Sequence, residues 1–203
     1  MPEDDLKSKD FDVSNIIVAE FSYIAQAAFQ ANEDRARASQ FFFLTFATLI
    51  AGLYSKQLNN VDYNQLYKAF AIMFFVLFVL GILTLLQLVR LRLAWLESII
   101  AMNHLKDQVM KDYPQTLGYF SWTSATTPST FKLNSIGFMI AMMVALLSGI
   151  AIGSSSAFLS LSSGAIGMPW ILSIAVGVVG SVFALISFYW LPLKKHKAFS
   201  LKR

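Results

Sequence analysis

The stretch LNSIGFMIAMMVALLSGIAIG, residues 133–153, decides the fold. Small residues recur in it at every fourth position, namely Gly137, Ala141, Ala145, Gly149 and Gly153. Residues four apart lie on one face of an α-helix, so this ladder predicts a smooth stripe that a second helix backbone can approach closely. In lipid, helix association depends on such close contact, because an apolar side chain is as favourably placed among acyl tails as among other apolar side chains. The stretch therefore indicates a packing helix of an integral membrane protein.

The composition places the whole chain in the membrane class. Of its 203 residues, 56% are hydrophobic and 14% are charged, whereas an average soluble domain carries about 25% charged residues. The net charge of +4 does not indicate nucleic-acid binding, because the basic residues flank apolar runs, which is how membrane proteins set their topology. The absence of cysteine excludes disulfides, zinc–thiolate sites and iron–sulfur clusters.

Four apolar stretches predict four transmembrane helices. They cover about 40–54, 69–89, 133–153 and 169–191. The first has only about fourteen residues after Gln40, which is short for a hydrocarbon core of about 30 Å that requires about 20 residues. The fourth repeats the small-residue pattern at Ser173, Gly177 and Ser181. The uncharged serine-rich connector that follows Gly153 is expected to form a short external loop or a partly re-entrant segment.

Two of these spans are expected to extend beyond the membrane as helices. Neither Gly nor Pro interrupts the chain from Val13 into the first span, or from the second span until Pro114. The two extensions can lie antiparallel and bury their apolar stripes on each other. Glu20 stands alone in an apolar surrounding, so we predict a cytoplasmic ion pair between Glu20 and Arg90, Arg92 or His104; the other interpretation is a titrating or ligand-binding carboxylate.

The distribution of Lys and Arg predicts the topology. The N-terminal segment holds four, the segment after the second span five and the C-terminal tail five, while the two remaining connections hold only Lys56 and Lys68. Because positive charge gathers on the cytoplasmic side, we expect a multi-pass protein of the plasma (inner) membrane with both termini and the long middle segment in the cytoplasm.

The expected organisation has five parts. Residues 1–12 are a disordered lead, and residues 13–112 form the amphipathic helix, the first two spans and the cytoplasmic extension. Residues 113–132 are an interfacial linker that contains Tyr119, Phe120, Trp122 and Phe131. Residues 133–191 form a glycine- and serine-rich transmembrane hairpin, and residues 192–203 a basic cytoplasmic tail. The fold class is all-α, a polytopic integral membrane protein.

The sequence lacks the chemistry of an enzyme or an ion-coupled transporter. The four predicted spans contain no Asp, Glu, Lys, Arg or His, which proton relays and intramembrane proteases require. Phosphate-binding loops, HExxH and GxSxG are also absent, and no ligand cluster for a metal can be found. We therefore expect neither catalytic residues nor a cofactor.

The first half of the chain resembles a known group of membrane effectors. The amphipathic helix EFSYIAQAAFQANEDRAR leads into a short span, and the second span is extended by RLRLAWLESIIAMNHLKDQ. This layout is similar to the small transmembrane effectors of bacterial antiphage and nucleotide-signalling systems, including the two-span SLATT group. The chain departs from it by adding a glycine-rich second hairpin. The resemblance implies membrane disruption triggered by a partner, and it transfers no site residue.

Two classes of function remain open. In the first, copies assemble in the lipid bilayer through Gly137, Ala141, Ala145, Gly149, Gly153, Ser173, Gly177 and Ser181, and the homo-oligomer forms a pore or perturbs the membrane in response to a cytoplasmic signal. In the second, the chain is an accessory or scaffold subunit that anchors a cytoplasmic protein partner. Self-assembly is expected in both classes. On the first hypothesis Gly149→Leu abolishes the membrane effect along with assembly, and Ser148, Ser173 and Ser181 face water.

Overall fold

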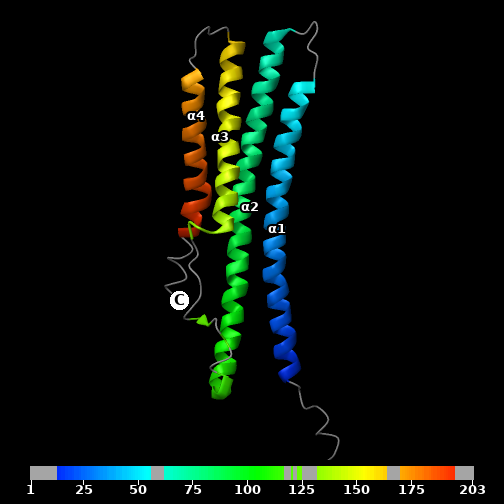
Figure 1. Ribbon diagram of the computed structural model, residues 1–203, viewed down its shortest axis with the longest axis vertical. Helices are drawn as coiled ribbons and strands as arrows, with labels where there is room; N and C mark the ends of the chain where they lie inside the picture. The colour runs from blue at the N-terminus through cyan, green and yellow to red at the C-terminus, as the bar shows by residue number, and fades with distance from the viewer. Residues whose placement is uncertain are drawn as a thin grey trace, which may run out of the picture. The chain divides into compact units, whose positions relative to one another are not determined.

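The computed structural model describes residues 13–55, 62–116, 120, 123–124, 132–163 and 170–194, and all regular secondary structure in these ranges is helical. The long helices are α1 (Val13–Ser55), α2 (Tyr63–Asp112), α3 (Ile136–Ser162) and α4 (Trp170–Leu185) (Figure 1). A short 3-10 helix, η2 (Pro114–Thr116), follows α2. The predicted disordered lead, three aromatic residues of the linker (Tyr119, Trp122 and Phe131) and the tail beyond Lys194 lie outside the described residues.

The continuous helices expected from the sequence are present. α1 runs 43 residues without a break, and α2 runs 50 residues and ends two positions before Pro114. α3 differs from the prediction because it continues past Gly153 to Ser162. The first part of the serine-rich connector, which was expected to be a loop or a re-entrant segment, is therefore helical. The hydroxyls of Ser156 and Ser160 donate to carbonyls of their own helix, at 2.8 Å and 3.0 Å, which keeps these polar groups compatible with an apolar helix.

Among the described residues, three helices are long and apolar enough to cross a membrane: Tyr63–Asp112, Ile136–Ser162 and Ile171–Lys194. The helical class and these three helices support an integral membrane protein. α1, which carries the first predicted span, is not one of them, and its apolar run is short and preceded by Arg35 and Arg37. On α4 the apolar side chains of Ile171, Ile174 and Val179 are more than 60% exposed, a surface suited to acyl chains.

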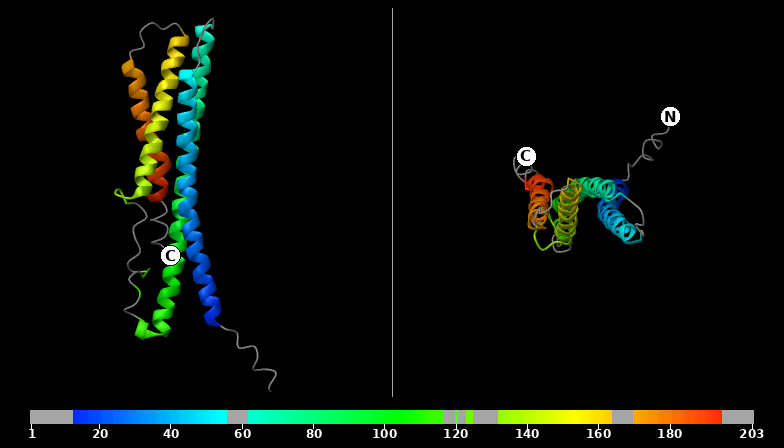
Figure 2. Two further views of the ribbon diagram at one scale, coloured as in Figure 1. Left: turned by 45° about the vertical axis from the view of Figure 1, so that its right-hand side comes forward. Right: turned by 90° about the horizontal axis from the view of Figure 1, so that it is seen from above.

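The chain divides into two compact units. Unit 1 comprises Met1–Ala31 and Ala94–Pro128, and unit 2 comprises Asn32–Leu93 and Ser129–Arg203. In unit 1 the first part of α1 lies beside the last part of α2 (Figure 2), with Ile24, Ala28 and Ile99 buried. Lys106 places its ammonium 6.0 Å from the centre of the Phe21 ring. Part of each predicted apolar stripe is therefore buried in this unit.

The core of unit 2 draws on all four long helices. Its larger cluster contains Phe42 of α1, Leu85 of α2 and Val144 of α3, with Ala184 from the last turn of α4. In a second cluster, the ring of Phe158 stacks on Phe74 at 5.7 Å between ring centres. α3 begins at a Ser135 cap, whose hydroxyl accepts from the Phe138 amide at 3.2 Å.

α4 changes its helical period near its end. It passes into a π-helical turn, η4 (Ile186–Trp190), and returns to α-helix for 191–194. Tyr189, within this turn, is 3% exposed and its ring lies 6.3 Å from that of Phe138. The π turn therefore keeps the end of this helix in contact with the start of α3.

Candidate functional site

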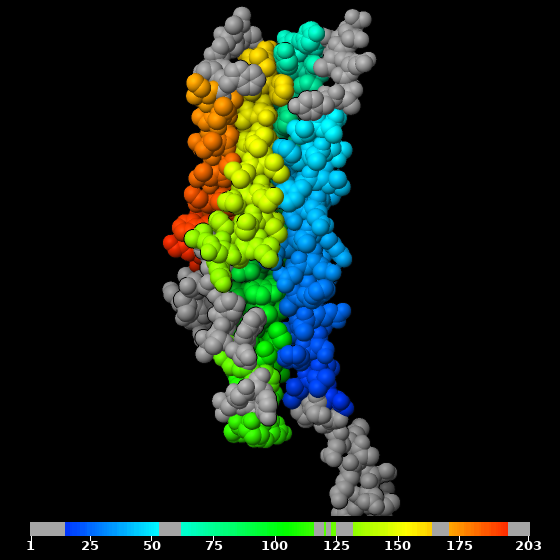
Figure 3. All heavy atoms as spheres, viewed as in Figure 1, coloured from blue at the N-terminus to red at the C-terminus, as the bar shows by residue number. Residues whose placement is uncertain are grey.

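The contact between α3 and α4 is built from glycine. A Cβ atom placed on Gly149 would collide with the Ser181 hydroxyl and the Gly177 carbonyl oxygen, and one on Gly153 would lie 2.8 Å from the Ser173 carbonyl oxygen. The backbones are therefore close enough that no side chain fits between them, and Figure 3 shows the atoms of the two helices in direct contact. Small residues are a geometric requirement of this helix pair.

The structure uses the predicted ladder within one chain. Gly137, Ala141, Ala145, Gly149 and Gly153 are all buried, as are Ser173 and Gly177, and Ser181 is half-buried. Because these residues already contact the chain's own helices, their predicted role as an interface between copies has no support in these contacts. Assembly through this face would require α4 to leave it.

A second glycine contact joins α2 to α3. A Cβ on Gly81 would collide with the Ser148 hydroxyl and would lie 3.2 Å from Cζ of Phe42 on α1. Ser148 is fully buried, and its hydroxyl donates to the Val144 carbonyl at 2.7 Å. Three helices therefore meet at one glycine, and the Ser148 hydroxyl, which the pore hypothesis places in water, is satisfied inside its own helix.

One buried hydroxyl bonds across helices. Ser155 of α3 donates to the Ala71 carbonyl of α2 at 2.8 Å, and its side chain is 8% exposed. The hydroxyl of Ser181, by contrast, donates to Gly177 within α4 at 2.9 Å. Ser155 therefore supplies a directional bond between α2 and α3.

Ser155→Ala is expected to destabilise unit 2 by about 1 kcal/mol, because interhelical hydrogen bonds in membrane proteins contribute about 0.6 to 1.7 kcal/mol. The matched control is Ser156→Ala, which removes a hydroxyl bonded to the Gly153 carbonyl of its own helix. Thermal unfolding of the purified chain in detergent measures both. Equal stability of the two variants would show that the bond to Ala71 contributes nothing.

An apolar groove of about 690 Å³ lies beside the α3–α4 contact. Gly149, Gly153 and Gly177 form part of its floor, and Phe74 and Ile50 reach it from α2 and α1. The polar side chains among its lining residues are serines, one of which, Ser181, is bonded within its helix. A groove of this composition accommodates hydrocarbon and offers no chemistry for a polar substrate.

A cluster of polar side chains lies at one end of unit 2. A Cβ on Gly137 would be 3.0 Å from Nη1 of Arg35 and 3.8 Å from the hydroxyl oxygen of Tyr189. On its other side, Nη2 of Arg35 donates to Oδ1 of Asn32 at 3.0 Å. The glycine at the second position of α3 therefore leaves room for a guanidinium and a phenol from two other helices.

The Arg35 guanidinium is held where its charge is disfavoured. Burial lowers the pKa of Arg35, the positive charge of Arg92 lowers this pKa further, and Tyr189 acts in the opposite direction. Arg92 is half-buried on α2. Two cations from different helices therefore act on each other in a partly desolvated place.

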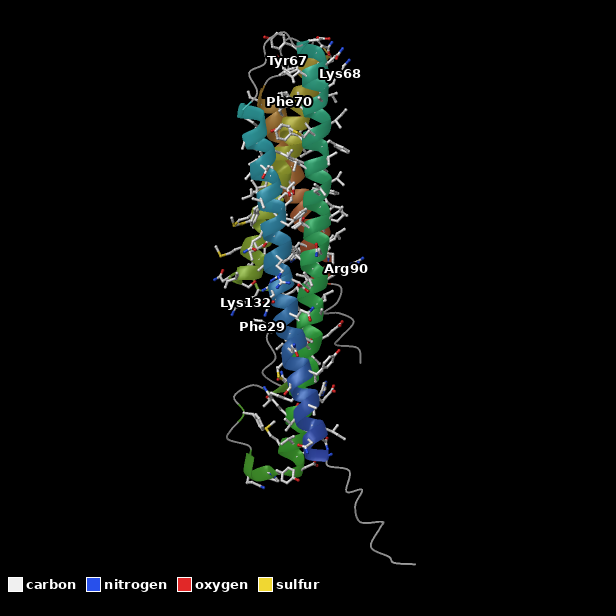
Figure 4. All side chains as sticks on the ribbon, turned by 90° about the vertical axis from the view of Figure 1, so that its right-hand side faces the viewer. Phe29, Tyr67, Lys68, Phe70, Arg90 and Lys132 are labelled. Atoms are coloured by element: carbon white, nitrogen blue, oxygen red, sulfur yellow. The ribbon has the colours of Figure 1, made fainter. Side chains whose placement is uncertain are left out.

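Other basic residues gather at the same end of unit 2. Figure 4 shows Arg90 and Lys132 at a similar level along the helix axes. Lys68 lies at the other end of the apolar part of α2. Lys194, five residues after Tyr189, places its ammonium 4.8 Å from the centre of the Trp190 ring. Charge therefore marks the ends of the apolar helices unequally.

The predicted ion pair of Glu20 receives no support. Glu20 is exposed, and the structure shows no ion pair between it and another described residue. Its neighbour Phe21 lies beside Lys106 of α2. His104 is exposed as well.

A buried polar contact in unit 1 was missed by the sequence reading. Asn103 is 2% exposed, and its amide donates to the Thr123 carbonyl at 3.2 Å. The bond ties the segment after α2 back onto that helix, which is a structural use of a buried amide. An asparagine between Met102 and His104 gives no signal of this in the sequence, because its partner lies 20 residues away.

The arginine and tyrosine cluster was also missed. Arg35 precedes the first predicted span and Tyr189 lies near the end of the fourth, and considering each span separately cannot bring the two residues together. Within the described residues, no group of three His, Asp or Glu side chains could hold a metal ion. No family model matches the chain, and no curated protein or solved structure matches it either.

Proposed function

We propose that the protein is a non-enzymatic membrane effector whose helical unit 1 receives a cytoplasmic signal and whose unit 2 perturbs the bilayer when copies assemble. The observation that carries this proposal is that α1 and α2 each run without a break from unit 1 into unit 2. A continuous helix transmits a displacement or rotation along its axis, and such elements carry coupling between distant sites.

The proposed arrangement in the membrane has four spans with both termini in the cytoplasm. The three apolar helices support part of it, and α1 contributes the fourth, short span. The unequal charge at the two ends of unit 2 supports the orientation, with the end that carries Arg90 and Lys132 in the cytoplasm. The exposed apolar side chains of α4 and the neighbouring groove are the surfaces we propose for lipid and for other copies.

A proline at the junction of the units tests the coupling. Ala94 is exposed, lies inside α2 and is the first residue of this helix that belongs to unit 1. Ala94→Pro is expected to break or kink α2 there, at a cost of about 3 kcal/mol. The control is Tyr63→Pro, which places the same residue at the first position of the same helix, where proline is tolerated.

The measurement is the membrane potential of bacterial cells, read with a voltage-sensitive dye as expression is induced. The native chain and Tyr63→Pro are expected to depolarise the cells, and Ala94→Pro, inserted at an equal level, is expected to leave the potential intact. Equal depolarisation by all three chains would contradict coupling between the units. An intact potential with all three would contradict membrane disruption by the chain alone and would favour the anchor function below.

A second function, that of an anchor for a cytoplasmic partner, is favoured by the polar groups of unit 2. The hydroxyls of Ser148 and Ser181 bond within their own helices, and Ser148 and Ser173 are buried. A single copy therefore offers no line of water-facing hydroxyls at these positions. If the chain is an anchor, the native chain, Tyr63→Pro and Ala94→Pro are all expected to bind the cytoplasmic partner through unit 1. None of the three is expected to change the membrane potential.

A further inference from the structure

The cationic cluster of unit 2 has the geometry of an anion site. Arg35 comes from α1, Arg92 from α2 and Tyr189 from the π turn after α4, and Gly137 of α3 forms the wall. Asn32 holds one nitrogen of the Arg35 fork, so the other points toward Gly137 and the phenol. Nη1 of Arg35 and the Tyr189 hydroxyl thus converge at Gly137, and the positive charge of Arg92 acts on the Arg35 guanidinium.

Electrostatics indicates the sign of the occupant. Burial and the positive charge of Arg92 both disfavour the charged form of the half-buried Arg35 guanidinium. An anion bound beside Nη1 of Arg35 would favour that charge, and Arg92 would attract the same anion. The planar fork of arginine matches the oxygens of a phosphate group, and a tyrosine hydroxyl can donate to the same group.

The place of the cluster in the chain indicates the source of the phosphate. Gly137 is the second residue of α3, Tyr189 lies five residues before the end of the apolar helix Ile171–Lys194, and Arg92 follows the apolar run of α2. These three positions lie where apolar helices end, which is the depth of lipid headgroups. We propose that Arg35, Arg92 and Tyr189 bind the phosphate group of an anionic phospholipid.

The test uses the purified full-length chain in detergent micelles, with thermal unfolding as the measurement. Phosphatidylglycerol is titrated in, and diacylglycerol with the same acyl chains is titrated as the lipid without phosphate. Glycerol phosphate and inorganic phosphate are added in separate samples as soluble sources. Stabilisation by a ligand that binds the folded state rises with its concentration, so the midpoint gives an apparent affinity.

Arg35→Gln and Arg92→Gln remove one cation each from the cluster. Their matched controls lie two residues away on the same helices: Arg37→Gln, whose side chain is 71% exposed and paired with Glu33, and Arg90→Gln, which is exposed. Each pair of variants changes the net charge equally, so a general attraction to anionic micelles affects both members alike.

We expect phosphatidylglycerol, but not diacylglycerol, to stabilise the native chain. The apparent affinity is expected to fall about tenfold in Arg35→Gln and in Arg92→Gln, which corresponds to about 1.4 kcal/mol, and to stay within about twofold in both controls. Equal losses in variants and controls would overturn the site. Equal stabilisation by glycerol phosphate or inorganic phosphate would overturn the lipid as its source.

Arg35→Lys keeps the test decisive if Arg35→Gln does not fold. Lysine retains the charge and loses the forked pair of donors, so we expect the apparent affinity to fall about threefold, since the geometry of a bidentate contact is lost while attraction persists. An affinity equal to that of the native chain would overturn the role of the Arg35 guanidinium.

Discussion

Leucine at Gly149 is expected to separate α3 from α4. Any side chain at this position collides with the Ser181 hydroxyl and the Gly177 carbonyl, and Cβ of Ser181 lies only 2.9 Å from the Cβ position. A backbone carbonyl cannot rotate away as the end of a flexible side chain does. The helices must therefore move apart, and we expect a loss of about 3 kcal/mol or more in stability, at the upper end of what overpacking costs.

Gly52→Leu is the matched control for this substitution. Gly52 is exposed on α1, and a Cβ there would meet no described atom within 4 Å. Both variants add the same apolar side chain to an apolar segment of a long helix, so they differ in packing and hardly in hydrophobicity. The thermal unfolding temperature in detergent is expected to fall strongly in Gly149→Leu and to change little in Gly52→Leu.

A cysteine pair reports the separation directly. The chain has no cysteine, and a Cβ on Gly180 would lie 2.7 Å from Cγ2 of Ile152, so Ile152→Cys with Gly180→Cys places two thiols across the α3–α4 contact. The disulfide is expected to form in membranes in the Gly52→Leu background and to be lost in the Gly149→Leu background. Efficient cross-linking in both would show that the contact tolerates leucine.

Gly81→Ala is expected to destabilise the meeting point of three helices by about 2 kcal/mol, because overpacking costs about 1 to 3 kcal/mol. The added methyl group collides with the Ser148 hydroxyl and lies 3.2 Å from the Phe42 ring. Ser148 is fully buried, so its side chain has no open space to enter. Thermal or denaturant unfolding of the purified chain measures the loss.

Ser148→Gly in the same chain turns this prediction into a double-mutant cycle. Alone it removes the buried hydroxymethyl group and places glycine inside a helix, which costs about 1 kcal/mol in propensity. Combined with Gly81→Ala, it moves the glycine of this contact from α2 to α3. The double variant is therefore expected to lose less stability than the sum of the two single losses, by about 1 kcal/mol or more. Additive losses would show that the two positions do not contact.

The long helices could be predicted because their determinants are local. α1 and α2 contain no residue that ends a helix at the membrane boundary, and Pro114 gives the end of α2 almost to the residue. The small-residue ladder was likewise visible as a face, because its period is a property of one helix. These features need no knowledge of what the helix packs against.

The partners of these faces could not be predicted in the same way. A ladder such as that of α3 has one pattern whether it packs on its own chain or on a copy, and the contact with Gly177 becomes known only from the arrangement of the helices. The same holds for Arg35 and Tyr189, which are 154 residues apart in sequence and come together through four packed helices. Glu20 stands alone among apolar residues in the sequence and is exposed in the structure, because isolation in the sequence is not burial in space.

The π turn gives the chain a property of a different kind, which concerns how its length can vary. The buried positions of the last helix are Ser173, Gly177, Ala184, Tyr189 and Leu193, and the step from 184 to 189 is five residues. On an unbroken α-helix a five-residue step turns a side chain by about 140° from its starting face. The wider turn absorbs the extra residue, as a one-residue insertion would be absorbed. A related sequence that lacks one residue between Ala184 and Tyr189 would keep the counterpart of Tyr189 on the buried face with a regular α-helix. A one-residue deletion between Gly177 and Ala184 would instead rotate Ala184 and the residues after it away from the buried face.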